Sequence, residues 1–168
     1  MKLALDAMGG DYAPQEIVLG GLDALNQHDF LEKIYLVGKR DAIEAVLKEA
    51  EKDRKVDYSK LEIVEASEVI EMADHPATAY RRKKDASITV ATRLVREGTA
   101  DAVVSAGSTG ALLTGATLIV KRVKGIRRAA MGPAMPNKAG GKTVICDCGA
   151  NAECTPEFLL QFGLVGTL

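Results

Sequence analysis

The fold is decided by the stretch DAVVSAGSTGALLTG, residues 101–115. Ala102–Ser105 holds small, β-branched and uncharged residues and predicts a short buried strand. The glycine turn Gly107–Gly110 follows at once, and the apolar run Ala111–Val120 predicts a buried helix. A strand, a glycine turn and a helix in that order place backbone N–H groups where they can hold a phosphate or a carboxylate.

Strand and helix patterns alternate on the N-terminal side of this stretch. Apolar strand patterns occur at Lys2–Leu5, Lys33–Val37 and Leu61–Val64, and helical spacing occurs at Gln15–Leu25, Asp41–Ala50 and Ile88–Glu97. This alternation predicts an α/β fold with a mostly parallel sheet and helices on both faces. We expect residues 1–168 to form a single α/β domain.

A different pattern follows residue 120. The turn NKAGGK, residues 137–142, separates apolar runs at Ala129–Met135 and Thr143–Asp147, which predicts a hairpin whose second strand is buried. Thr155 is a candidate N-cap for a last helix that begins at Pro156 and remains apolar to the end of the sequence. We expect either the rest of a longer protein or a partner subunit to cover this helix.

Glycine-containing loops follow three predicted strands, and ligands of parallel sheets bind at the carboxyl ends of the strands. The loops contain Gly9 and Gly10, Gly107–Gly110, and Gly149–Asn151. Asp6 and Asp11 flank the first pair, so we expect this loop to form one wall of an anion site. The alternative for the first loop is a turn whose acidic residues cap a helix.

The only basic cluster lies in the segment DHPATAYRRKKDAS, residues 74–87. Arg81–Lys84 leads into a predicted helix that Asp85 or Ser87 could cap, and this order favours anion binding. The alternative is a solvated charged face. A nucleic-acid surface is disfavoured, because the segment has one aromatic residue, Tyr80, and the whole chain has a net charge of −1.

Composition excludes several other classes of protein. No apolar run approaches the length of a membrane span, and the N-terminus does not resemble a signal peptide, so we expect a cytoplasmic protein. The cysteines, Cys146, Cys148 and Cys154, are odd in number, which argues against disulfides. Their spacing and the distant histidines, His28 and His75, also argue against a metal site, so we expect small buried side chains.

Four segments together resemble the bacterial acyl-carrier-protein:phosphate acyltransferases. They are LALDAMGGDYAP at 3–14, YRRKKDAS at 80–87, DAVVSAGSTGALL at 101–113 and GKTVICDCGANAECTPEFLLQFG at 141–163. The segments follow the family's order and span nearly the whole chain. The sequence departs from the family pattern at Ser108, where asparagine is common, and in the cysteine-rich segment 146–154.

The resemblance implies transfer of a fatty acyl group from the thioester of acyl carrier protein to inorganic phosphate, which gives acyl phosphate for phospholipid synthesis. It also implies a fold like isocitrate and isopropylmalate dehydrogenases, a homodimer, no metal or organic cofactor, and peripheral contact with the inner face of the membrane. Family members are about twice as long, so the chain is expected to be the N-terminal half of such an enzyme.

The chemistry of this reaction assigns expected roles. Lys83, Lys84 and Ser87 would hold phosphate, and Asn151 would donate to the thioester oxygen. The Gly107–Gly110 turn would add backbone donors and the hydroxyls of Ser108 and Thr109, opposite a wall of Asp6, Gly9, Gly10 and Asp11. No cysteine nucleophile is required, because phosphate itself attacks the thioester.

Other functions remain open on the sequence. They are a coenzyme-A-dependent phosphotransacetylase, a decarboxylating dehydrogenase of the same fold group, a non-catalytic anion-binding fragment, and a nucleic-acid binder acting through Arg81–Lys84. The dehydrogenase would need a metal site built from several aspartates, and the sequence offers no convincing cluster.

Overall fold

The computed structural model describes residues 1–151 and 153–167, which divide into two compact units, Met1–Val120 and Lys121–Leu168. The first unit contains β1 (Lys2–Asp6), α1 (Gln15–Gln27), β2 (Lys33–Gly38), α2 (Arg40–Ala50), the 3-10 turn η1 (Tyr58–Lys60), β3 (Leu61–Glu65), α3 (Pro76–Arg82), α4 (Ser87–Arg96), β4 (Ala102–Val104), α5 (Thr109–Gly115) and the π-helical turn η2 (Ala116–Val120). The second contains β5 (Ala134–Pro136), β6 (Lys142–Val144) and α6 (Pro156–Val165).

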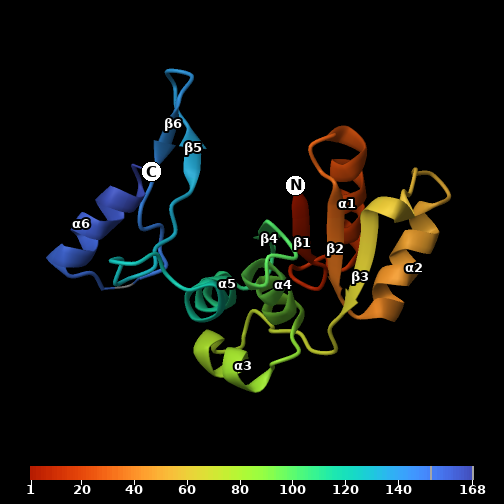
Figure 1. The fold of residues 1–168 in the computed structure, drawn as a ribbon, viewed down its shortest axis with the longest axis horizontal. Helices are drawn as coiled ribbons and strands as arrows, with labels where there is room; N and C mark the ends of the chain where they lie inside the picture. Colours follow the sequence, from red (N-terminus) through yellow and green to blue (C-terminus); the bar gives the residue numbers. More distant parts are fainter. Residues whose placement is uncertain (152, 168) are drawn as a thin grey trace. The chain divides into compact units, whose positions relative to one another are not determined.

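The first unit is built on a four-stranded sheet in the order β3-β2-β1-β4, with all strand pairs parallel (Figure 1). The chain moves outward from β1 to β3 and then crosses back to β4 on the other side of β1. Right-handed connections therefore place α1 and α2 on one face and α4 on the other. The predicted parallel sheet with helices on both faces is confirmed.

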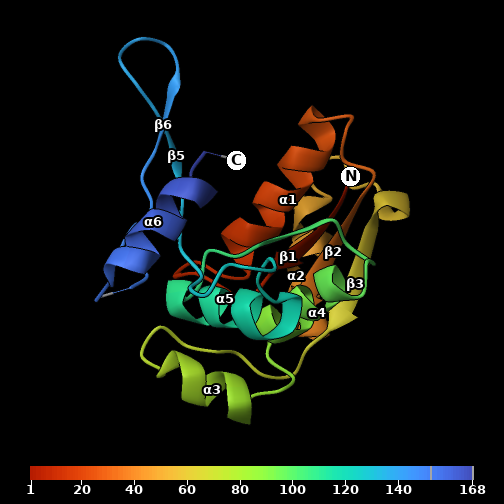
Figure 2. The same ribbon diagram turned by 60° about the vertical axis from the view of Figure 1, so that its left-hand side comes forward.

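Alternate residues of the strands supply the two cores on either side of the sheet. In β2, Ile34 and Leu36 pack with buried residues of α1 and α2, whereas Tyr35 and Val37 pack with Val90 and other residues near α4. Figure 2 shows these helices on the two sides of the strands. β2 is therefore buried along nearly its whole length, as is typical of a parallel strand covered on both faces.

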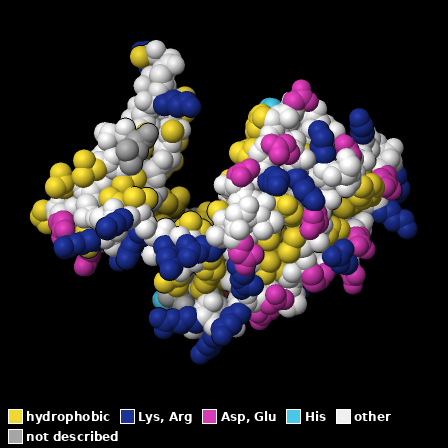
Figure 3. Space-filling view, viewed as in Figure 1, with side chains coloured by type: hydrophobic (Ala, Val, Ile, Leu, Met, Phe, Trp, Pro, Cys, Tyr) yellow, Lys and Arg dark blue, Asp and Glu magenta, His cyan; other side chains and the backbone are white. Residues whose placement is uncertain are grey.

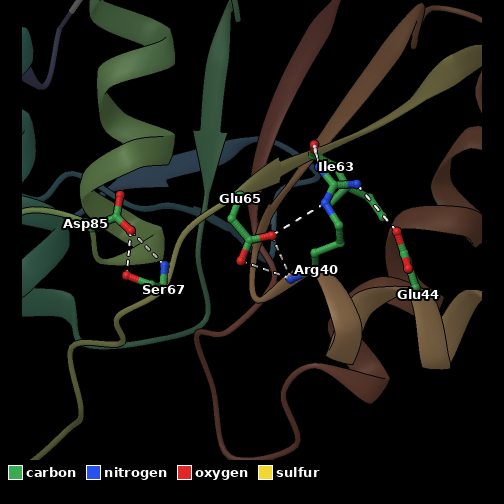
Figure 4. A network of polar contacts seen from close by, with 6 residues as sticks. All are labelled: Arg40, Glu44, Ile63, Glu65, Ser67 and Asp85. Carbon is green, nitrogen blue, oxygen red and sulfur yellow. Dashed lines mark hydrogen bonds and ion pairs between the residues drawn. The ribbon is translucent and has the colours of Figure 1, made fainter.

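The free edge of β3 is covered by Arg40 at the start of α2 (Figure 4). Its Nη2 donates to the carbonyl of Ile63 at 3.2 Å, and its Nε lies 3.5 Å from Glu65 Oε2. Its Nη1 also contacts Glu44 one helical turn away at 3.4 Å. A charged side chain on an edge carbonyl hinders pairing with another strand.

The structure corrects the burial predicted for residues 102–120. β4 is the other edge strand of the sheet, and Val104 is 47% exposed. The predicted helix forms, but as α5 followed by η2, and Leu118 and Val120 are exposed. The apolar composition indicated burial, but edge position and helical phase leave these side chains uncovered within the first unit.

The basic segment contains a helix, α3, that the sequence analysis did not predict. Pro76 occupies its first turn, a position that proline favours. The predicted capping of α4 by Asp85 or Ser87 is wrong, because Ala86 is the N-cap and makes no side-chain bond. Asp85 instead accepts hydrogen bonds from the backbone and side chain of Ser67, at 2.9 and 2.6 Å (Figure 4).

The second unit confirms the hairpin but not its burial. β5 and β6 pair antiparallel, and both are exposed. The glycine loop Gly149–Asn151 therefore follows a strand of this hairpin and not a strand of the parallel sheet, contrary to expectation. Thr155 caps α6 as predicted, since its Oγ1 accepts from the N–H of Phe158 at 3.4 Å.

Candidate anion site at the carboxyl ends of β1 and β4

The order of the strands reverses between β1 and β4, and this is where open α/β sheets bind ligands. The loop with Gly9 and Gly10 leaves the end of β1, and the loop with Gly107–Gly110 leaves the end of β4. Two of the three predicted glycine loops therefore meet at the carboxyl ends of these neighbouring strands. The register, which pairs Leu5 with Val104, brings their first residues together.

Asp6 and Ser105 join these two strand ends. The Ser105 hydroxyl donates to Asp6 Oδ2 at 2.7 Å across a sequence separation of 99 residues. Asp6 Oδ1 accepts from the N–H of Met8 at 3.3 Å, and the side chain is only 2% exposed. Asp6 thus serves as an acceptor inside the site and does not face solvent as a wall residue.

Glycine is required where the loops touch. A Cβ atom at Gly9 would lie 2.5 Å from Asp6 Oδ2, 2.8 Å from Ser105 Oγ and 2.9 Å from the nitrogen of Gly107. Gly10 has a φ of +120°, a conformation that side chains other than glycine rarely adopt. The adjacent Asp11 is exposed, so of the four residues of the expected wall Asp6 and the glycines lie where the loops meet and Asp11 does not.

The turn from Gly107 to Gly110 has fewer free donors than the sequence suggests. The N–H of Gly107 donates to Ser105 Oγ at 3.1 Å, and Ser108 Oγ accepts from the N–H of Ala111 at 3.3 Å, as an N-cap. The backbone N–H groups of Ser108, Thr109 and Gly110 have no hydrogen-bond partner among the described residues. Thr109 is exposed and Ser108 is buried.

Helix α3, which lies within the basic segment, packs against this turn. Its first residue, Pro76, packs so closely on Gly110 that a Cβ there would lie 2.6 Å from the proline ring. Further along α3, Tyr80 lies against Gly115 and is 6% exposed. Burial raises the pKa of Tyr80 against the opposing effect of the nearby Thr92 and Thr89 hydroxyls, and the Tyr80 hydroxyl makes no hydrogen bond of regular geometry among the described residues.

The lysines beyond α3 differ in their surroundings. Lys83 is half-buried, and its Nζ donates to the carbonyl of Val69 at 2.8 Å and pairs with Asp74 Oδ2 at 2.5 Å. The hydrogen bond from Lys83, followed by one from the N–H of Glu71, lowers the pKa of Asp74. Lys84 is exposed and forms no ion pair among the described residues.

Ser87 lies in the first turn of α4 and is buried. Its N–H donates to the carbonyl of Glu68 at 3.0 Å. Ser87 and Lys83 are thus held by the neighbouring loop, whereas Lys84 keeps a free ammonium group.

Asn151 lies in the second unit, where its side chain is fully engaged. Its amide nitrogen donates to Asp147 Oδ2 at 2.9 Å and to the carbonyl of Ala129 at 3.0 Å, and its amide oxygen accepts from Arg128 Nε. Burial opposes ionisation of Asp147, but hydrogen bonds from Met131 and Asn151 outweigh it and lower the pKa of this carboxyl. Asn151 therefore has no spare amide donor in this conformation.

The cysteines are free thiols, and Cys148 and Cys154 are exposed, so the expectation of small buried side chains is wrong for both. Cys146 is partly buried; burial, and then the nearby Asp147, raise the pKa of its thiol. Among residues 1–151 and 153–167 no group of three His, Cys, Asp or Glu side chains is placed to hold a metal ion.

The sequence analysis missed one polar residue in each unit, namely Ser105 in the first and Asp147 in the second. Ser105 ends the quoted strand and directly precedes the glycine turn, so its position was visible, but its partner Asp6 is distant in sequence. Asp147 follows Cys146 in a motif considered only for its cysteines and Asn151.

Comparison with known proteins identifies the family to which the chain belongs. A family model described as "Fatty acid synthesis protein" matches residues 1–168. A phosphate acyltransferase of Clostridium kluyveri is 48% identical over 168 residues, which are all of this chain and 48% of the relative. The chain belongs to the phosphate acyltransferase family.

Other phosphate acyltransferases are similar over the whole chain. That of Heliobacterium modesticaldum is 52% identical and that of Pelotomaculum thermopropionicum 51%, and the chain covers 48% and 47% of them. The chain thus spans about half the length of these curated relatives. Within the described residues, no helix is both long and apolar enough to cross a membrane.

Proposed function

We propose that the chain takes part in transferring a fatty acyl group from acyl carrier protein to inorganic phosphate, with acyl phosphate as the product. The observation that carries the proposal is the meeting of two glycine loops at the β1–β4 switch point in a chain that matches phosphate acyltransferases over its full length. The proposal includes a fold of the isocitrate and isopropylmalate dehydrogenase type, a single domain, a homodimer and peripheral contact with the membrane.

In the proposed reaction, a phosphate oxygen attacks the carbonyl carbon of the thioester. The new C–O bond gives a tetrahedral centre, the C–S bond then breaks, and the departing thiolate takes the remaining proton of the phosphate group, so that the products are a thiol and acyl phosphate. Phosphate must be held close to the carbonyl, because positioning lowers the entropic part of the barrier. The Gly107–Gly110 turn, with the Thr109 hydroxyl, offers donors for this purpose.

The basic segment supplies positive charge in this proposal. Lys84 contacts phosphate through its free ammonium, while Lys83 and Ser87 hold the segment in place through Asp74 and Glu68. Arg81 and Arg82 are exposed on α3, where Figure 3 shows Lys and Arg side chains gathered. These arginines are suited to the acidic surface of acyl carrier protein.

Asn151 can donate a hydrogen bond to the thioester oxygen only if its amide group changes partners. Both of its N–H groups are engaged, so donation to the thioester oxygen would require release of Asp147 or of the Ala129 carbonyl. The main role proposed for Asn151 is therefore to hold the Arg128 side chain in place. Donation to the thioester oxygen would follow only after one of these partners is released.

The proposal is tested by phosphate-dependent loss of acyl thioester from acyl carrier protein, with the acyl phosphate trapped by hydroxylamine. The assay is run on this chain and on a version of the length of its relatives, with acyl coenzyme A as a parallel substrate. Turnover of acyl carrier protein by the longer version supports the proposal. Turnover of coenzyme A thioester alone favours a phosphotransacetylase, and turnover of neither by the longer version overturns acyl transfer.

Lys84→Ala tests the proposed phosphate contact in the same assay. Loss of a charge-assisted hydrogen bond to phosphate is expected to raise the KM for phosphate about tenfold. Lys48→Ala, at an exposed position of α2, is the matched control and should leave this KM unchanged. Equal values for both variants would remove Lys84 from the site.

A further inference from the structure

The Ser105 hydroxyl is the hydrogen-bonded link between the two glycine loops. It donates to Asp6 Oδ2 at 2.7 Å and accepts from the N–H of Gly107 at 3.1 Å. A serine hydroxyl carries one proton, so donation to Asp6 turns its lone pairs toward Gly107. The buried carboxylate therefore fixes the direction in which Ser105 accepts.

We propose that Ser105 is a positioning residue for phosphate, an inference that rests on the proposed function. Ser105 acts through Gly107: by accepting its N–H, it fixes the first peptide of the turn that carries Ser108, Thr109 and Gly110. The hydroxyl does not contact phosphate, since its proton and an acceptor site are already in use.

The packing around Ser105 leaves the turn little freedom while this link is intact. A Cβ atom at Gly107 would lie 3.1 Å from the Cα of Gly9 and 3.3 Å from Ser105 Oγ, so the two loops are in van der Waals contact. Gly107 itself has no side chain to restrict its rotation. Its orientation thus depends on the bond to Ser105, and loss of that bond would add the entropic cost of ordering the turn to phosphate binding.

Removal of the hydroxyl would also leave the buried Asp6 Oδ2 without its serine donor. An unpaired buried carboxylate oxygen favours rearrangement of the two loops. Both effects act in the same direction, toward weaker phosphate binding.

The test measures the dissociation constant of inorganic phosphate for the chain by titration of its backbone amide resonances. The variants are Ser105→Ala, Ser105→Thr and Ser105→Val, where the last two have the same shape and differ in the hydroxyl. Ser59→Ala is the matched control, because it removes another serine–aspartate hydrogen bond, 2.6 Å long, from the exposed turn η1.

We expect Ser105→Ala and Ser105→Val to bind phosphate about tenfold more weakly than the wild type, and Ser105→Thr within about threefold of it. Ser59→Ala should leave phosphate affinity unchanged, even where urea unfolding shows lower stability. The inference is overturned if Ser105→Val binds as tightly as Ser105→Thr. Failure of the wild type to bind phosphate overturns the proposed phosphate site, and this outcome is distinct because it appears before any substitution.

Discussion

At the scale of single residues, the candidate site depends on which polar groups are already paired. Asp6 is buried and pairs with Ser105, while Lys83 pairs with Asp74 and the carbonyl of Val69. Of the two lysines in the basic segment, Lys84 is exposed and forms no ion pair among the described residues. Residue type alone made these groups equal candidates, and their hydrogen bonds separate residues that hold the structure from residues that are free to bind an anion.

The Asp74–Lys83 ion pair predicts how stability depends on pH. The folded state lowers the pKa of Asp74 below its ordinary value of 3.8. The stabilisation is therefore present above the unfolded pKa and is lost as pH falls through the folded one. We expect Asp74→Asn to lower the urea midpoint at neutral pH, with a difference from wild type that shrinks in acid. A difference independent of pH would contradict this account.

Tyr80 gives a second prediction at this scale. Its hydroxyl is buried without a partner among the described residues, and such a group costs free energy. Tyr80→Phe is therefore expected to raise the free energy of unfolding by about 1 kcal/mol. The measurement is urea unfolding at neutral pH. A decrease of similar size would show that the hydroxyl has a favourable contact.

At the scale of elements, glycines decide how closely loops and helices approach. Gly9 lies against Asp6, Ser105 and Gly107, whereas a Cβ atom at Gly20 in α1 would meet no other atom within 4 Å. The same substitution should therefore have opposite effects at the two sites.

We expect Gly9→Ala to destabilise the chain by about 1–3 kcal/mol, because overpacking forces backbone to shift. Gly20→Ala should stabilise it by about 0.5–1 kcal/mol, because alanine is the better helix former. Chemical unfolding of both variants measures the difference. Equal effects of the two substitutions would contradict the close packing of the loops.

The elements also show what the sequence could predict. The alternation of strand and helix patterns, together with the glycine turn after residues 102–105, was sufficient to predict the parallel sheet and the loop that follows β4. α3 was missed, because the basic residues of its last turn drew attention to charge instead of helical spacing. The exposure of Val104 and of β6 depends on which strands are edges, and local composition does not encode that.

At the scale of the whole molecule, the chain forms two compact units and spans about half the length of its curated relatives. In the second unit, α6 exposes Leu159, Leu160 and Leu164, and Figure 3 shows hydrophobic side chains gathered there.

Asp6 and Ser105 are a long-range pair, so no local pattern predicted their contact. The loops that meet in the first unit are nevertheless complete within the chain, and phosphate binding can be tested apart from acyl transfer.

The central claim is that phosphate binds at the glycine turn at the end of β4. It is tested most directly by adding inorganic phosphate to the isotope-labelled chain and following each backbone amide resonance. The account predicts saturable shifts at Ser108, Thr109 and Gly110, and smaller ones near Gly9. Shifts confined to residues 81–87 of the basic segment, with the turn unchanged, would contradict it.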